Sequence, residues 1–534
     1  MYTILDFYTD EPAGLGVPPF LGTYPRYIAG AIIKNKINPN YLTVDDLRYY
    51  KKTIELKKEI SEEKKNHKTD ISIYNRTRSL DEIEKIIKNT KVLIIICGIH
   101  VPGKYLSAIP GNIHEVERLA SYFNCFKIFA GPAASEHGTQ LEGGKKIDKK
   151  IYDFIDSFDF VLHVNKEPYL IELIKKIESN GDINNGDQFL QRYNFDDYRE
   201  VSLLGSKIVE QHPLFPKRVI VEIETGKGCS TGKCSFCTEP LKNRTEHRVK
   251  KDIYDEVVEF YKLGIRSFRL GKQSDFFMYQ GGNKDEIESL LKDIWSACPD
   301  IENFHIDNVS PRTIVKHKWG RDITKLAVKY FTEGNITAFG AETFDPKIIE
   351  INNLNSEQKI TMKAIEIVNE YGSERGPNGM PKLLPGLNLL FGLPGETKKT
   401  HEINMKCLKK IYDDGLMLRR INIRRVVDYG GTKLSEMKKE MSKTKRNQKY
   451  YWKWRNDIRQ NIDNPMLKRI APEGLILKNL ITEIYDGNIT FARHLGTYPL
   501  IVGIKGRIPL NKKVDVKITK HQLRSLTGEV VKIH

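Results

Sequence analysis

The sequence has 534 residues, more than one hydrophobic core usually organises, so we expect two to four domains rather than a single binding module. With 40% hydrophobic and 29% charged residues, the composition is that of a folded protein and excludes a largely disordered chain. The formal net charge of +17 favours polyanionic partners such as RNA, although a nucleotide bias of the genome can also enrich lysine.

Membrane insertion and secretion are both disfavoured. The longest purely apolar run, Val92 to Cys97, is far shorter than the roughly 20 residues that span a bilayer. The N-terminus, Met1 to Asp6, lacks the basic and then apolar layout of a signal peptide. Seven cysteines, an odd number with three of them crowded together, indicate metal binding in a reducing compartment rather than a disulfide framework. We therefore expect a cytoplasmic protein.

The first segment of the chain contains no recognisable catalytic or ligand-binding motif. Residues 1–90 are expected to form an N-terminal extension, with a Gly- and Pro-rich start followed by a charged helical stretch, Leu47 to Lys88. Residues 91–210 then alternate between strands and helices, which predicts a small open α/β layer, a Rossmann-like domain. Its predicted helix is Ile113 to Phe123, and its predicted strands are Lys91 to Cys97, Lys127 to Ala130 and Phe158 to Val164.

Residues 217–432 repeat strand and helix at the spacing of a parallel barrel. Six strands with helices between them predict a partial (β/α)6 barrel of the TIM type, in which active residues lie at the C-terminal ends of the strands. The predicted strands are Val219 to Glu224, Ser267 to Leu270, Phe304 to Asp307, Ile336 to Ala341, Gly386 to Phe391 and Arg420 to Val427.

Two further segments follow the predicted barrel. Residues 433–470 form a basic helical connector that contains aromatic residues between Tyr450 and Trp454. Residues 471–534 consist of short alternating segments, which predict a small β-rich module. A helix-hairpin-helix that uses Lys520 to Gly528 is the alternative fold for this module.

Three cysteines follow the first predicted barrel strand. Cys229, Cys234 and Cys237 would lie on one loop at the catalytic rim, where their thiolates can wrap a single cluster. Three ligands leave one iron of a four-iron cluster open, whereas a structural zinc site would require a fourth ligand. An iron-sulfur site that binds a cofactor and a zinc knuckle completed by a distant His or Cys both remain open at this point.

These cysteines resemble the signature of the radical S-adenosylmethionine (SAM) superfamily, in which an aromatic residue, here Phe236, precedes the third cysteine. The common signature has three residues between the first two cysteines, and this sequence has four, Ser230 to Lys233. Gly232 can absorb the extra residue by taking a positive φ angle. The resemblance implies a 4Fe-4S cluster, SAM as cofactor, cleavage of SAM to a 5′-deoxyadenosyl radical, and a protein electron donor.

The same resemblance implies further SAM-binding residues at the ends of later strands. Besides Phe236, it points to Lys272, Gln273, Asp307, Glu342, Asn388, Gly392, Gly395 and Arg424. More closely, the chain resembles archaeal-type radical SAM iron-sulfur oxidoreductases of unassigned function. That likeness runs through Cys234 to Pro240, His305 to Asn308, Ala341 to Thr343, Gly392 to Thr397 and Arg420 to Arg424.

The α/β layer resembles cobalamin-binding domains, in which a loop after the first strand carries an Asp-x-His-x-x-Gly motif. Here His100 to Gly103 supply the His and the Gly, but Gly98 stands in place of the Asp that would orient the His. Cobalamin is therefore an alternative cofactor, and a degenerate domain that covers the barrel is the other interpretation. Methylthiotransferases are also similar, but they bind a second cluster through three N-terminal cysteines, whereas only Cys97 and Cys125 precede the motif here.

The C-terminal half carries many cations beside aromatic residues. This combination suits single-stranded RNA or a tRNA loop, and the alternative is a solvated helix whose aromatic residues pack on the barrel. The terminal module resembles the small β-barrel of RNA-modifying enzymes. The main hypothesis is thus a radical SAM enzyme that modifies RNA, in particular tRNA. The alternatives are cobalamin-assisted radical methylation of a small molecule or protein, and a non-catalytic iron-sulfur or zinc protein that binds nucleic acid.

Overall fold

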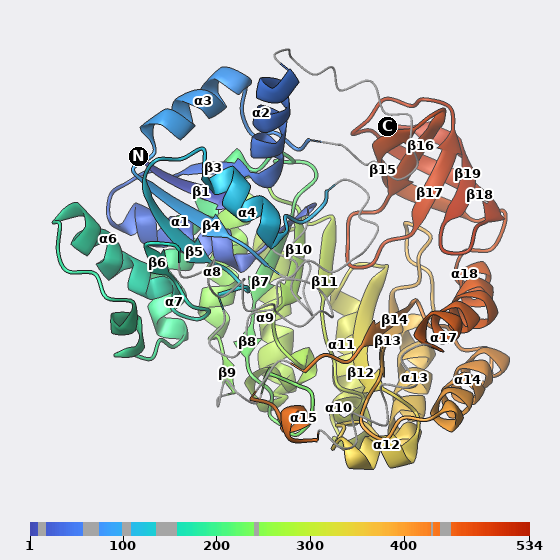
Figure 1. Ribbon diagram of the computed structural model, residues 1–534. Coiled ribbons are helices and arrows are strands. Elements are labelled where there is room, and N and C mark those ends of the chain that lie inside the picture. Colours follow the sequence, from blue (N-terminus) through green and yellow to red (C-terminus); the bar gives the residue numbers. More distant parts are fainter. Residues whose placement is uncertain are drawn as a thin grey trace. The chain divides into compact units, whose positions relative to one another are not determined.

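The computed structural model divides the chain into two compact units (Figure 1). Unit 1 comprises Met1–Ile223 with Lys251–Arg266, and unit 2 comprises Glu224–Lys250 with Ser267–His534. The structure describes residues 1–8, 18–56, 74–98, 108–134, 157–239, 245–428, 431–437 and 450–534. No helix within these residues is both long and apolar enough to cross a membrane.

Unit 1 is built on a five-stranded parallel sheet in the order β3-β1-β4-β5-β6. The strands are β1 (Tyr2–Asp6), β3 (Asn40–Thr43), β4 (Val92–Ile96), β5 (Phe126–Ala130) and β6 (Phe160–Val161). In order along the chain this is a 2-1-3-4-5 arrangement, the flavodoxin-like form of the doubly wound fold. The three predicted strands are confirmed, but the first 90 residues are not an extension, because they supply β1 and β3.

Helices cover this sheet because its strands are apolar on both faces. Leu47, Ile83 and Val116 bring α2 (Val44–Leu56), α3 (Leu80–Asn89) and α4 (Ile113–Ala120) into one apolar core with the strands. The remaining helices of the unit are α1 (Thr23–Lys34), α6 (Leu170–Glu178), α7 (Phe195–Leu204) and α8 (Lys250–Lys262), with 3-10 turns η1 (Glu167–Tyr169), η2 (Asn185–Phe189) and η3 (Gly205–Gln211). The short strand β2 (Phe20–Leu21) pairs in parallel with β7 (Ile220–Glu224).

Helix α1 packs closely against α7 because glycines stand where their backbones meet. A Cβ atom on Gly30 would lie 1.9 Å from the carbonyl oxygen of Val201, and one on Gly205 would lie 1.8 Å from that of Arg26. No larger residue fits at either position without separating the two helices.

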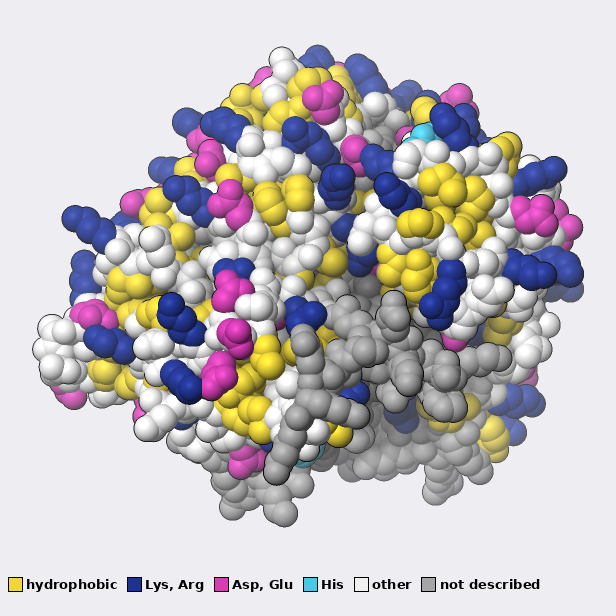
Figure 2. Space-filling model, turned by 90° about the horizontal axis from the view of Figure 1, so that it is seen from above, with side chains coloured by type: hydrophobic (Ala, Val, Ile, Leu, Met, Phe, Trp, Pro, Cys, Tyr) yellow, Lys and Arg dark blue, Asp and Glu magenta, His cyan; other side chains and the backbone are white. Residues whose placement is uncertain are grey.

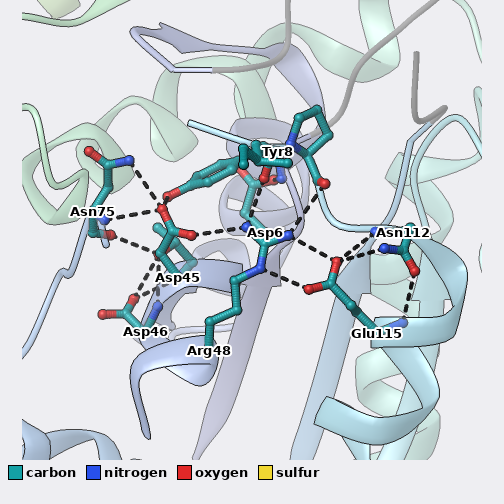
Figure 3. A network of polar contacts seen from close by, with 11 residues as sticks. Asp6, Tyr8, Asp45, Asp46, Arg48, Asn75, Asn112 and Glu115 are labelled. Atoms are coloured by element: carbon teal, nitrogen blue, oxygen red, sulfur yellow. Dashed lines mark hydrogen bonds and ion pairs between the residues drawn. The ribbon is translucent and has the colours of Figure 1, made fainter. Parts of the chain in front are cut away.

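A buried polar network joins the carboxyl ends of β1 and β3 to α2 and α4 (Figure 3). Asp45 accepts hydrogen bonds from the hydroxyl of Tyr8 at 3.0 Å and from the amide groups of Asn75 at 3.1 Å. Arg48 donates from Nε and Nη2 to both carboxylate oxygens of Glu115, at 2.9 Å each, and from Nη1 to Asp45 at 3.0 Å. These carboxylates are satisfied by the protein itself, so the network has a structural explanation.

Unit 2 contains the later strands of the predicted barrel. β10 (Ser267–Gly271) pairs in parallel with β11 (Asn303–Ile306), and β12 (Asn335–Glu342), β13 (Leu383–Phe391) and β14 (Arg420–Arg425) form a second parallel sheet. All six predicted strands are confirmed at their positions. The helices after these strands are α9 (Lys284–Ala297), α10 (Pro311–Lys316), α11 (Gly320–Tyr330), α12 (Pro346–Ile351), α13 (Gln358–Gly372) and α14 (Lys398–Asp413), with the 3-10 turn η5 (Phe276–Gly281) after β10.

The predicted helical connector covers the outer edge of β14. After α15 (Lys433–Glu436), the described chain resumes at α17 (Tyr451–Ile458), the π-helical turn η7 (Arg459–Asp463) and α18 (Asn464–Ile470). The Tyr451 hydroxyl donates to the carbonyl oxygen of Ile423 at 3.1 Å, and Arg459 Nη1 donates to that of Ile421 at 2.8 Å. Side chains therefore satisfy strand carbonyls that a seventh strand would otherwise pair with.

The C-terminal module is a closed five-stranded barrel in the order β15-β16-β17-β19-β18. Its strands are β15 (Ile476–Asp486), β16 (Ile489–Arg493), β17 (Ile501–Lys505), β18 (Lys513–His521) and β19 (Leu526–Ile533). The β-rich prediction is confirmed, and the helix-hairpin-helix alternative is wrong, because residues 520–528 belong to β18, β19 and their turn. One apolar core joins Leu480 and Val502 of the barrel to Ile336 and Leu384 of unit 2's sheet.

Candidate active site around the cysteine loop

The three cysteines follow the short strand β8 (Gly226–Lys227), which pairs with β9 (Glu246–His247). The backbone of Ser235, between two of them, is held on both sides. Its N–H donates to the carbonyl oxygen of Asn352 at 2.9 Å, and its own carbonyl accepts from the N–H of Leu434 at 2.8 Å. The predicted positive φ of Gly232 is confirmed at 39°. The longer spacing between the first two cysteines is thus accommodated by this glycine.

Apolar packing fixes the second half of the loop. Cys234 and Phe236 pack against a buried cluster made of Ile348, Ile349, Leu354, Leu393, Val426 and Leu434. The aromatic residue before the third cysteine therefore anchors the loop, while all three thiols keep partial exposure and form no disulfide. A partly exposed set of thiols on an anchored loop is open to a ligand.

The thiols lie near enough to influence one another. Burial is the main reason that the pKa of Cys234 is raised to about 11 and that of Cys237 to about 12, and negative charge on neighbouring cysteines contributes to both rises. Such thiols remain protonated at neutral pH unless a cation replaces the protons. The donor set fits an iron-sulfur cluster, which supplies that positive charge. Among the described residues, no three His, Cys, Asp or Glu side chains are arranged to hold a single metal ion.

A cavity of about 300 Å³ adjoins the loop. Its wall includes Gln273, whose Oε1 accepts from the Thr225 hydroxyl at 2.9 Å, and Ser274, whose hydroxyl donates to the carbonyl of Gly228 at 2.8 Å. Lys272, the preceding residue, has a φ of 66°, a conformation that costs energy in a residue with a side chain. The strand end predicted to bind SAM therefore holds a strained backbone beside an open cavity.

Sequence reasoning missed two residues of this cavity wall that carry ionisable groups, a lysine and an aspartate. Lys227 is buried and lies 3.8 Å from the carboxylate of Glu224. Asp275 accepts from the Thr313 hydroxyl at 2.6 Å, and burial raises its pKa to about 7. Two sequence features could have identified them. Lys227 stands between two glycines just before the first cysteine, and Asp275 comes soon after a predicted strand.

The end of β12 carries a bulge that turns Glu342. The register against β13 shifts between Phe339 and Glu342, and Glu342 has a φ of 61°. Bulges of this kind re-aim a side chain and are frequent beside active sites. Burial raises the pKa of Glu342 to about 8, and the positive charge of Arg424 partly opposes that rise. The negative charge of Glu342 in turn raises the pKa of Cys234, so Glu342 lies near the cysteine loop.

Asn388 and Arg424 are brought together through a third residue. The side-chain amide group of Asn422 lies 3.1 Å from Oδ1 of Asn388. When the amide oxygen of Asn422 is turned toward Arg424, it accepts a hydrogen bond from Nε of Arg424 at 2.8 Å. Three predicted residues, Glu342, Asn388 and Arg424, thus belong to one polar group on the sheet β12-β13-β14.

Asp307 stands apart from that group. Its carboxylate forms an ion pair with Arg269, and both side chains are almost completely buried. Gly392 and Gly395 have φ angles of 91° and 85°, and the carboxylate of Glu396 accepts the N–H groups of Gly392 and Leu393. These residues shape strand ends and a turn, and their predicted contact with SAM remains a prediction.

Replacement of Glu342 by Gln tests its buried environment. A carboxyl whose pKa rises from 4.5 to about 8 on folding keeps its proton in the folded protein, so stability falls as pH rises through this range. Glu342→Gln removes the penalty, and we expect the variant to gain about 3 kcal/mol over the wild type between pH 5 and pH 8. Urea denaturation at both pH values measures the gain. An equal difference between the proteins at both pH values would contradict the assignment.

The candidate cobalamin loop cannot be placed in the same way. His100 to Gly103 lie outside the described residues. The strand before that loop, β4, is the third strand of its sheet in chain order rather than the first, and it lies beside β1. The position of the motif therefore differs from the expected one.

The fold and site define a multidomain α/β protein with a three-thiol loop after the short strand β8. No family model matches the chain. An uncharacterized protein of Methanocaldococcus jannaschii is 39% identical over 547 residues, covering 99% of this chain and 93% of that protein. The chain belongs to the same family as this archaeal protein.

Two more distant similarities concern proteins with described functions. A tRNA-2-methylthio-N(6)-dimethylallyladenosine synthase of Rickettsia rickettsii is 21% identical over 476 residues, covering 86% of this chain and 93% of the synthase. Among solved structures, the radical S-adenosylmethionine methyltransferase TsrM of Kitasatospora setae matches with 14% identity and a TM-score of 0.48. That match covers 79% of this chain and 72% of TsrM.

Proposed function

We propose that this protein is a radical SAM enzyme in which Cys229, Cys234 and Cys237 hold a 4Fe-4S cluster. The observation that carries the proposal is the anchored loop itself, with three partly exposed thiols beside a cavity. When bound, a reduced cluster of this kind supplies the electron that cleaves SAM to methionine and a 5′-deoxyadenosyl radical. TsrM, with which the chain shares the similarity above, has been solved with a [4Fe-4S] cluster and cobalamin bound.

The chain's own residues would bind and orient SAM. Gln273, which lines the cavity beside the loop, and the preceding residue Lys272, whose backbone is strained, would face the methionine part of SAM. Glu342, protonated at neutral pH, would donate a hydrogen bond to a ribose hydroxyl, with Asn388 and Arg424 beside it. Apolar packing around Phe236 would exclude water from the site.

Anaerobic reconstitution tests this function. Purified protein would be loaded with iron and sulfide, reduced with dithionite, and incubated with SAM. We expect about four iron atoms per chain and release of 5′-deoxyadenosine, detected by mass spectrometry. An intact cluster that releases no 5′-deoxyadenosine would overturn the proposal and favour a non-catalytic protein.

We propose RNA, in particular tRNA, as the substrate class. The net charge of +17 and the closed β-barrel after the core support this choice. The Rickettsia relative with 21% identity acts on tRNA by its name. The nucleoside profile of RNA from cells that lack this protein tests the choice, because a missing modified nucleoside is expected and an unchanged profile would contradict it.

Cobalamin-assisted methylation is the second candidate function. One observation favours it, the 2-1-3-4-5 strand order of unit 1, a fold that binds ligands at the point where the strand order reverses. Protein expressed with cobalamin supplied would then retain it through size-exclusion chromatography. A His100→Ala variant that loses cobalamin would assign the ligand, and a wild-type protein without cobalamin would remove this candidate.

A further inference from the structure

The positive charge of this chain is not concentrated in a single surface patch on the face shown in Figure 2. Lys and Arg side chains are spread over that face, with acidic side chains between them. Net charge alone therefore does not say where a polyanion binds. Within unit 2, however, arginines converge from three elements on the outer edge of β14.

The first element of this arginine cluster is β14. Every second residue of a strand points to the same face, so Arg420, Asn422 and Arg424 lie on one side of β14. The guanidinium group of Arg420 lies 3.7 Å from the ring centroid of Tyr498, in the loop between β16 and β17. Arg419, just before the strand, donates from Nη2 to the carbonyl of Pro499 at 2.7 Å.

The second and third elements are the helical connector and the terminal barrel. Arg459 is 7% exposed and reaches β14 through the carbonyl of Ile421. Arg524 lies in the turn between β18 and β19 and is exposed. It is close enough to Arg455, Arg459 and Arg420 for their positive charges to act on its guanidinium group. Although part of Arg524 is exposed, the neighbouring protein atoms remove water from its guanidinium group, and this desolvation together with the nearby cations lowers its pKa to about 10. Similar causes lower the pKa of Arg419 to about 10.

Among the residues that the structure describes, the carboxylates near this cluster are too few to balance its positive charge. Asp463 forms an ion pair with Arg459 and is the carboxylate that also acts on Arg419 and Arg524. The Nε atoms of Arg419 and Arg459 are buried without a hydrogen-bond partner. Partly desolvated guanidinium groups held together in this way are unfavourable unless an anion joins them, and phosphate is the anion whose geometry arginine matches best.

An exposed aromatic ring adjoins the cluster. Trp452 of α17 is 63% exposed, and the guanidinium group of Arg455 lies 5.4 Å from its ring centroid, one helical turn away. Its neighbours behave differently, because Tyr451 and Trp454 are buried against Phe391. The packing interpretation is therefore right for Tyr451 and Trp454. The ring of Trp452 contacts that of Tyr451 edge-on, with centroids 5.1 Å apart, but most of its surface stays exposed.

We propose that the arginine cluster, Arg419, Arg420, Arg455, Arg459 and Arg524, binds backbone phosphates of single-stranded RNA while a base stacks on Trp452. Arginines beside an exposed indole match the paired recognition of phosphate and base in single-stranded nucleic acid. A phosphate-bearing metabolite shares the phosphate chemistry but does not need the exposed ring. The choice of RNA rests on the proposed function, whereas the site itself does not depend on SAM cleavage.

Fluorescence anisotropy with the full-length protein and a short labelled single-stranded RNA tests the site. Trp452→Ala removes the stacking surface, and we expect RNA affinity to fall about tenfold. Arg524→Gln removes one phosphate contact, which should reduce the slope of log affinity against log salt by about 0.7. Both side chains are exposed, so melting temperatures should not change. Arg118→Gln on α4 of unit 1 is the matched control, since it removes the same charge from an exposed site.

Two outcomes would overturn this inference. The first is an equal loss of affinity in Arg118→Gln, which would mean that only net charge matters. The second is competition by adenosine monophosphate at the same concentrations as RNA, which would identify a mononucleotide site. The assay needs no cluster, so loss of binding in a protein that still releases 5′-deoxyadenosine, or the reverse, separates this inference from the proposed function.

Discussion

Replacement of Cys234 by alanine is expected to abolish cluster binding and to lower 5′-deoxyadenosine release by about a thousandfold or more. The physical reason is that each thiolate holds a separate iron, so loss of one leaves two ligands and a second open iron. The same result is expected for Cys229→Ala and Cys237→Ala. Iron and sulfide content after anaerobic reconstitution, together with the visible absorption of the cluster, measures the effect separately from catalysis.

Two other cysteines supply the matched control. Cys298 and Cys407 are buried at or within helices α9 and α14, away from the loop in sequence. Cys298→Ala and Cys407→Ala should each cost about 1 kcal/mol of stability through lost packing, with full iron content and activity. If the loop variants kept the iron content of these controls, the cysteine loop would not be the cluster site.

The repeated core of the protein could be predicted because local pattern determines it. Six apolar runs separated by helical stretches marked the strands, and each lies where the sequence placed it. The extra residue in the cysteine loop was likewise local, since Gly232 could be identified as the residue able to take a positive φ. These features depend on residues that are close in sequence.

The beginning of the chain was misjudged for the opposite reason. β1 has five residues and β3 has four, which is too short for either to show a strand pattern of its own. β1 pairs with β4, about ninety residues away along the chain, and β3 pairs with β1, so neither pairing is visible in the composition. A short strand gains its stability from its neighbours, so its existence could not be inferred from its own residues.

The site residues show the same difference between features set by local sequence and features set by distant contacts. Polar residues at strand ends could be identified from strand positions, but their partners could not. The pairing of Asp307 with Arg269 and the bulge that turns Glu342 depend on contacts between strands. The arginine cluster is the clearest case, because Arg420, Arg459 and Arg524 are far apart in sequence and meet only through the folding of three elements.

The division of the chain between the units has a similar origin. Helix α8 follows the cysteine loop in sequence and was expected within the barrel, yet Lys251–Arg266 belongs to unit 1. Glu256 of α8 forms an ion pair with Arg26 of α1, and both side chains are completely buried. Arg26 also donates from Nε to the carbonyl of Gly22 at 2.9 Å and from Nη2 to that of Glu222. One guanidinium group thus joins α1, α8 and β7.

Removal of the Glu256 carboxylate should therefore destabilise unit 1 strongly. Glu256→Ala leaves a guanidinium charge buried without its counter-ion, which typically costs about 3–5 kcal/mol, and the melting temperature should fall by about 10 °C. Differential scanning calorimetry measures the change. Glu200→Ala is the matched control, because Glu200 pairs with Lys34 of the same helix α1 at 2.5 Å but at an exposed position. That variant should lose less than about 0.5 kcal/mol.

A double replacement distinguishes buried charge from lost packing as the cause. In Arg26→Met with Glu256→Leu, both charges are absent and apolar groups fill a similar volume, so most of the stability lost in Glu256→Ala should return. Glu256→Gln should fall between these variants, because the amide oxygen still accepts a hydrogen bond but carries no charge. If Glu256→Ala were no less stable than Glu200→Ala, the ion pair would not be what attaches α8 to unit 1. If the double variant stayed as unstable as Glu256→Ala, the carboxylate would act through shape rather than charge.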